Sequence, residues 1–220
     1  MGRTRLEASF TCMIVFAATL LPGQQQASKH EPLIWEPPPV TDFPTSVKPT
    51  VRKQMIASLR VSDLPIVLEK TEMAAVQKKL GGSMGSRGDA GSALQWLCFH
   101  GVSANGRWVL WLMSSEIDGP SIGGFRWQKV ADGVGFDAGC QALSGKGGVV
   151  LPAEIRPGVS ERAVTSAFGQ PSRKAIKTLY YLHEHEESLH DQPYTVMNTL
   201  EVLLRGGIVW SIELWKSTTS

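Results

Sequence analysis

The chain has 220 residues, and its 22 Lys and Arg against 20 Asp and Glu leave a formal net charge of only +2. Such a balance gives no concentrated basic face of the kind that nucleic-acid-binding proteins use. It also gives no polybasic patch for an anionic membrane surface. We therefore expect neither nucleic acid nor lipid headgroups as partners.

The first 27 residues have the pattern of a secretory signal peptide. Arg3 and Arg5 precede an apolar run from Phe10 to Leu21. This run is shorter than the roughly 20 apolar residues that a transmembrane helix needs. The sequence therefore predicts export, with residues 1–27 removed and no integral membrane segment left behind. We expect the mature protein in the periplasm or outside the cell.

Residues 28–50 form a predicted proline-rich tether. Proline cannot donate to a helix or to a sheet ladder, so we expect an extended segment with little packing of its own. Trp35 and Phe43 are the side chains able to dock onto a folded body. A spacer, or an arm that packs on its own domain, is the simplest interpretation, and a peptide ligand for another domain is the alternative.

Two cysteines remain after signal cleavage, Cys98 and Cys140. In an oxidising compartment an isolated pair is most simply a disulfide. Two buried free thiols and a metal-binding pair are the alternatives, although a structural zinc site takes four ligands.

The remaining sequence reads as one folding unit written twice, over residues 51–148 and 149–220. Each unit begins with a helix pattern, continues with three strand patterns and contains the phrase Gly-Gly-x-x-Trp near its end. The expected helices are Thr71–Leu80 and Ser160–Phe168. The expected strands are Leu94–His100, Arg107–Ser114 and Ile122–Val130, then Ile176–His183, Thr195–Leu204 and Ile208–Trp215. This order predicts an α+β fold of two tandem α-βββ repeats with antiparallel meander sheets behind a proline-rich N-terminal arm.

The second unit carries a resemblance to a known family. Its helix ends on Val164, Phe168, Gly169 and Pro171, in the order Val-x-x-x-Phe-Gly-x-Pro. With three strands after it, the unit resembles the repeat of the SmpA/OmlA (BamE) outer-membrane assembly lipoproteins, tandem copies of which also form the β-lactamase inhibitor protein fold. The resemblance implies binding of envelope proteins or inhibition of an enzyme. The lipid-anchor cysteine of those lipoproteins has no counterpart here.

Tryptophans are the main candidates for a partner-binding surface. Residues 107–113 are apolar on both alternating faces, so this strand is buried on both sides or offers one side to a partner. Trp111 and Trp215 each lie opposite the more regular apolar stripe of their strand, and we predict that they contact a partner, with Trp96 as a third contact.

The histidine-rich stretch after residue 182 offers a second chemistry. His183 and His185 point the same way on a strand, and a turn could bring His190 back towards them. Three imidazoles with neighbouring carboxylates suit zinc or copper. The alternative is the polar tip of a hairpin that faces water, in which case the protein needs no cofactor.

Ser83 is the serine of a segment that matches the hydrolase nucleophile-elbow motif Gly-x-Ser-x-Gly. That elbow needs a strand before it and a helix after it, whereas here a helix pattern comes first. The leading hypothesis is therefore a non-enzymatic binding module of the bacterial envelope, either an assembly accessory factor or an inhibitor or immunity protein. Its partner would be an envelope or secreted protein. A metal-binding envelope protein and a Ser83 hydrolase are the alternatives.

Overall fold

A computed structural model of the chain describes residues 33–40, 44, 47–49, 55–89, 91–143, 148–189 and 192–219. The predicted signal peptide and His190 lie outside these residues. Strands dominate the described part. Their bounds are β1 (Ser58–Val61), β2 (Leu64–Val67), β3 (Met84–Arg87), β4 (Leu94–Ser103), β5 (Gly106–Ser115), β6 (Gly124–Lys129), β7 (Gln141–Ala142), β8 (Val149–Val150), β9 (Arg173–Lys174), β10 (Thr178–Leu189), β11 (Gln192–Arg205) and β12 (Ile208–Thr219).

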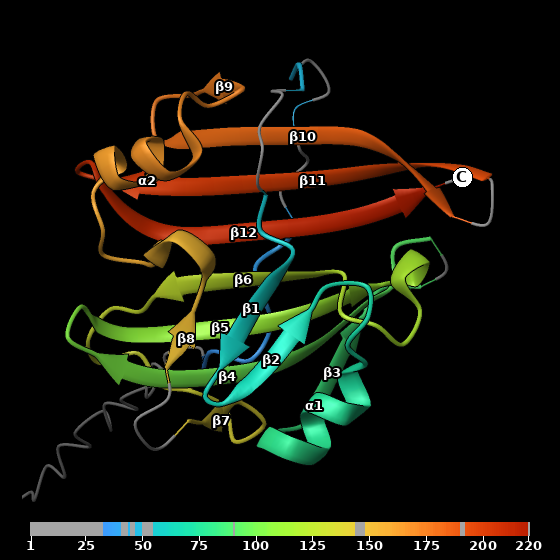
Figure 1. Cartoon of the computed structure of the whole chain (residues 1–220). Coiled ribbons are helices and arrows are strands. Elements are labelled where there is room, and N and C mark those ends of the chain that lie inside the picture. Colours follow the sequence, from blue (N-terminus) through green and yellow to red (C-terminus); the bar gives the residue numbers. More distant parts are fainter. Residues whose placement is uncertain are drawn as a thin grey trace, which may run out of the picture. The chain divides into compact units, whose positions relative to one another are not determined.

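Most of these strands form one sheet (Figure 1). Its nine strands follow the order β3-β4-β5-β6-β12-β11-β10-β9, with β7 added beside β4. All pairs are antiparallel except β4 with β7. The pairing of β6 with β12 joins the first and second halves of the chain into one continuous layer.

The expected α+β fold of two tandem α-βββ repeats is wrong. Within the described residues the chain has only two α-helices, α1 (Met73–Leu80) and α2 (Glu161–Phe168), of eight residues each. Two 3₁₀ turns, η1 (Glu116–Asp118) and η2 (Pro152–Glu154), add little helix. The protein is mainly β because six further short strands join the six that the sequence predicted. In addition, β10 and β12 run past their expected ends, and β11 begins before its expected start.

The two helices begin differently. Ser160 is the N-cap of α2, and its Oγ accepts a hydrogen bond from the backbone N–H of Ala163, 3.3 Å away. Thr71 does not cap α1, because Glu72 is the N-cap and the Thr71 hydroxyl instead accepts from the backbone N–H of Val67, 2.9 Å away. Both helices end at a glycine with positive φ, Gly81 and Gly169, as helix C-termini commonly do.

The nine-stranded sheet has a hydrophobic core on each face. The larger core packs the sheet against α1, α2 and a second sheet of order β2-β1-β8. The smaller core lies on the opposite face of β4 and β5. Strand β5 contributes to both, because Trp108, Leu110 and Leu112 enter the larger core while Val109, Trp111 and Met113 enter the smaller one. Of the two alternatives for this strand, burial on both sides is the one that occurs.

Candidate functional site

Three tryptophans lie flat against glycines on neighbouring strands. Gly85 pairs with Trp96, Gly101 with Trp108, and Gly124 with Trp215. A Cβ on any of these glycines would come within 2.3–2.5 Å of the facing indole. The glycines therefore leave the space in which each of these three rings lies against the backbone.

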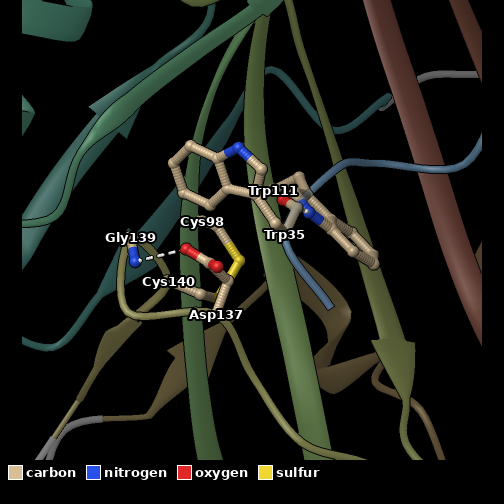
Figure 2. Close-up of a disulfide and its surroundings, with 6 residues drawn as sticks. All are labelled: Trp35, Cys98, Trp111, Asp137, Gly139 and Cys140. Atoms are coloured by element: carbon tan, nitrogen blue, oxygen red, sulfur yellow. Dashed lines mark hydrogen bonds between the residues drawn. A yellow bond between two sulfur atoms is a disulfide. The ribbon is translucent and has the colours of Figure 1, made fainter. Parts of the chain in front are cut away.

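The disulfide between Cys98 and Cys140 is confirmed. It joins β4 to the connector between β6 and β8, and both cysteines are buried. Asp137 holds the connector in a turn beside the disulfide. Its carboxylate accepts a hydrogen bond from the backbone N–H of Gly139, and its backbone carbonyl oxygen accepts one from the N–H of Cys140. Figure 2 shows the bridge with Trp35 and Trp111 next to it.

Residues 33–40 of the predicted tether pack on this connector. Ile34 forms a parallel bridge with Phe136, exchanging backbone hydrogen bonds of 3.0 Å with Gly135 and Asp137. From β3, the Arg87 guanidinium donates to the carbonyl oxygens of Pro37 and Pro38, at 2.6 and 3.1 Å. These contacts hold the arm against the sheet face that carries the smaller core.

The arm covers two of the three tryptophans that were expected to meet a partner. Trp111 is 2% exposed, and its Nε1–H donates to the Trp35 carbonyl oxygen, 3.1 Å away. Trp96 is 1% exposed and meets the Trp35 ring edge to face, with centroids 5.8 Å apart. The expectation that these indoles are exposed is wrong, since the chain's own Trp35 occupies the surface in front of them.

Trp215 is the exception. It is half-buried and lines an apolar hollow of about 340 Å³ at the η1 end of the sheet. Its Nε1–H donates to Glu213 Oε1, 2.9 Å away, while Gly124 lies under the ring. The indole is thus held at its polar edge and at one face. The apolar side chains beside it are those of Val40, Ala93, Leu94 and Ile117.

The far wall of the hollow is the η1 turn. A capping box holds this turn, because the Asp118 carboxylate accepts the backbone N–H of Ser115 at 2.7 Å and Ser115 also caps the turn. Glu116 accepts the backbone N–H of Gly91 and so ties the η1 turn to the loop that precedes β4. Ile117 at its tip is 79% exposed. Together with the apolar lining of the hollow, Ile117 forms a contiguous exposed apolar surface, which is a common mark of an interaction site.

A row of side chains crosses the sheet beneath this surface. Arg126 on β6 lies opposite Glu213 on β12, and their side chains form a buried ion pair with Nη2 and Oε2 2.8 Å apart. Glu201 on β11 lies opposite Glu213. Burial raises the pKa of the Glu213 carboxyl, although Arg126 acts against this. Burial, and then the neighbouring Glu213, raise the pKa of Glu201.

The histidine cluster lies on the opposite face of β10–β12. His183 and His185 point to the same side of β10, with ring centroids 4.9 Å apart. His185 Nε2 lies 2.9 Å from Glu187 Oε1. The described residues bring together no group of three His, Cys, Asp or Glu side chains with metal-site geometry. The third predicted ligand, His190, is outside the described residues.

Ser83 lies in the segment between α1 and β3. Its side chain is exposed, and its backbone N–H donates to the Gly139 carbonyl oxygen, 3.1 Å away. A helix precedes this serine and a strand follows it, which is the reverse of the order in a hydrolase elbow.

Sequence reasoning missed a basic hollow at the other end of the sheet. About 220 Å³ in volume, it is lined by Trp108, Trp127, Arg107, Lys129 and Arg156, and none of the described residues of its lining is acidic. The Arg107 guanidinium is already engaged, because it donates to the carbonyl oxygens of Ala131 and Val134. The three cations are spread over 50 residues of sequence, so only the folded sheet brings them together.

Within the described residues, no helix combines the length and the apolar character needed to cross a lipid bilayer. Comparisons with protein-family models, with curated proteins and with solved structures gave no match to this chain.

Proposed function

We propose that this chain is an exported, non-enzymatic binding module of the bacterial envelope, and that its partner protein docks an apolar side chain into the hollow beside Trp215. The partner would be an envelope or secreted protein that the module helps to assemble or inhibits. The Trp215 hollow carries the proposal, since it is the place where a predicted contact residue meets solvent and exposed apolar neighbours.

The size and lining of the hollow support a protein side chain as its occupant. Its volume of about 340 Å³ is near the lower end of the roughly 300–1,000 Å³ range of ligand pockets. Ile117, at 79% exposed, and Val40, at 43%, extend the apolar surface beyond the hollow itself. Interface hot spots typically consist of one large apolar side chain in such a pocket, surrounded by a rim that excludes water.

The rigidity of Trp215 supports the same function. Its ring lies on Gly124 and its Nε1–H is bound by Glu213, which Arg126 holds in turn. An indole held in this way loses little conformational entropy when a partner binds, which favours affinity. The buried indoles of Trp96 and Trp111 then pack beneath this surface and do not contact the partner themselves.

Export is supported by the disulfide. A buried bridge between Cys98 and Cys140 is typical of proteins that fold in an oxidising compartment. The signal-peptide pattern of residues 1–27 predicts the same destination independently.

The test compares two exposed isoleucines. The variant Ile117→Glu places a charge at the rim of the hollow, and Ile176→Glu is the matched control, because Ile176 is 97% exposed and does not line the hollow. Each mature protein is used as bait for the periplasmic fraction of the native host with brief cross-linking. We expect one envelope protein to be enriched by the unaltered chain and by Ile176→Glu, and to be lost with Ile117→Glu and with Trp215→Ala. Equal capture by all four baits would contradict the proposal, as would recovery of only a second copy of this chain.

A further inference from the structure

The face of the sheet opposite Trp215 carries polar side chains where the larger core ends. Tyr181, Leu200 and Leu214 form one apolar row across β10, β11 and β12. In the next row towards the hairpin tip on the same face are His183, Asn198 and Lys216. Asn198 is only 3% exposed. The row next to the last apolar row of the larger core therefore consists of polar side chains, which need hydrogen-bond partners.

Three atoms in this region are buried without such a partner among the described residues. They are Nδ1 of His183, Nδ1 of His185 and Oδ1 of Asn198. Buried polar atoms in native proteins are almost always satisfied, and each exception calls for an explanation. Here His183 and Asn198 lie directly opposite each other, and His185 is two residues along from His183 on the same face. The strand register therefore places the three residues next to one another on one face of the sheet.

The hydrogen bond of His185 indicates which kind of partner its Nδ1 can take. Its Nε2 lies 2.9 Å from Glu187 Oε1. In the tautomer that donates this hydrogen bond, Nε2 carries the proton and Nδ1 of His185 keeps a free lone pair. A histidine whose second nitrogen donates to a carboxylate is the usual arrangement of a metal ligand, because the carboxylate orients the ring and increases its basicity.

The two rings also have the spacing that a shared ion requires. A metal lies about 2.0–2.1 Å from an imidazole nitrogen, and therefore roughly 3.2 Å from the centroid of that ring. Two rings bound at a tetrahedral angle then have centroids roughly 5 Å apart. The observed separation is 4.9 Å, with the rings tilted by 52°.

We propose that His183, His185 and Asn198 bind one divalent transition-metal ion of the zinc or copper class, with Glu187 as the residue that positions His185. Imidazole nitrogens select zinc and copper over calcium and magnesium, which prefer oxygen ligands. The nearby Lys216 does not oppose the ion strongly, because its Nζ is paired with Glu69 Oε2, 2.5 Å away. The partly exposed His185 ring gives the ion a path from solvent.

The test uses the full mature chain with its disulfide intact, treated with a chelator and then titrated with Zn²⁺ or Cu²⁺ against a chromophoric competitor. We expect one equivalent of ion to bind, copper more tightly than zinc, with no competition from Mg²⁺. His183→Gln and His185→Gln should each abolish stoichiometric binding. Glu187→Gln, at an exposed side chain that cannot disturb the core, should weaken zinc binding by about 10- to 100-fold.

The matched control is His100→Gln. His100 lies in β4, where its ring stacks on that of Phe136. It is not one of the proposed metal ligands, so replacing it should leave the metal affinity unchanged. Thermal unfolding of each variant without metal confirms that the fold is retained. Absence of binding by the unaltered chain would overturn the proposal. Binding that survives in the double variant of His183 and His185 would do the same.

Discussion

At the scale of single residues, the two glycines of the phrase Gly-Gly-x-x-Trp have different structural roles in the two halves of the chain. Gly123 and Gly124 lie in extended backbone and make room for the Asp118 carboxylate and the Trp215 ring. Gly206 and Gly207, with φ of 59° and 75°, instead form the turn between β11 and β12. The repeated phrase Gly-Gly-x-x-Trp therefore does not show that the two halves are equivalent.

The glycine–tryptophan pairs give a residue-scale prediction. In Gly101→Ala, the new Cβ would come within 2.4 Å of the Trp108 ring. The indole would have to move inside a packed core, and such overpacking typically costs about 1–3 kcal/mol. Urea denaturation measures the expected loss. Gly148→Ala is the control and should be close to neutral, because a Cβ there meets no atom of the described residues within 4 Å. Equal stability of the two variants would contradict the close packing of Gly101 on Trp108.

At the scale of elements, six strands could be predicted and six could not. The short run of residues 107–113, apolar on both faces, indicated β5, because such a run is typical of a strand that is buried on both sides. β1, β2, β3 and β7–β9 have two to four residues each, too few for any periodicity to show. The extensions of β10 and β11 were missed because residues 184–188 are charged or polar on both faces, and only pairing with a neighbouring strand makes them extended.

The polar row across β6, β12 and β11 gives an element-scale prediction. The pKa of Glu201 is raised above its ordinary value of 4.5, chiefly by burial and then by Glu213. The folded state thus holds this proton more tightly than the unfolded state. The protonated Glu201 carboxyl therefore contributes fully to the free energy of unfolding below pH 4.5. This contribution is lost as the pH rises through the raised pKa of Glu201 in the folded state.

Glu201→Gln should therefore raise the urea midpoint at neutral pH, and the gain should disappear below pH 4.5. The exposed Glu184 on β10 supplies the control Glu184→Gln, for which we expect little change at either pH. A Glu201→Gln variant that is less stable than the unaltered protein at neutral pH would show that the charged carboxylate is needed by the fold.

At the scale of the whole described body, one disulfide connects the sheet to the segments that cover its smaller core. The bridge itself could be predicted from the number of cysteines. The packing of the arm beside the bridge could not be predicted. Trp35 and Trp111 are 76 residues apart in the sequence, and neither segment contains a pattern that indicates contact with the other. For this reason the sequence led to Trp96 and Trp111 as exposed contacts, although the arm covers both.

The bridge gives a prediction at this scale. It closes a loop of 42 residues, for which loop-closure entropy corresponds to about 4 kcal/mol. The double variant Cys98→Ala with Cys140→Ala should lose about 2–4 kcal/mol of unfolding free energy. Because the connector holds the arm, proteolysis within residues 33–40 should also become faster. Cleavage at the unaltered rate in the double variant would show that Arg87 and Trp35 hold the arm without the bridge.

The central claim is that a partner protein docks beside Trp215. The most direct measurement replaces Ile117 with a photo-cross-linking amino acid, and Ile176 with the same group as the control, in the exported protein of the native host. The account predicts that irradiation produces one cross-linked species from position 117, heavier by the mass of a single partner, and none from position 176. An adduct of the same partner from both positions, or no intermolecular adduct from position 117, would contradict it.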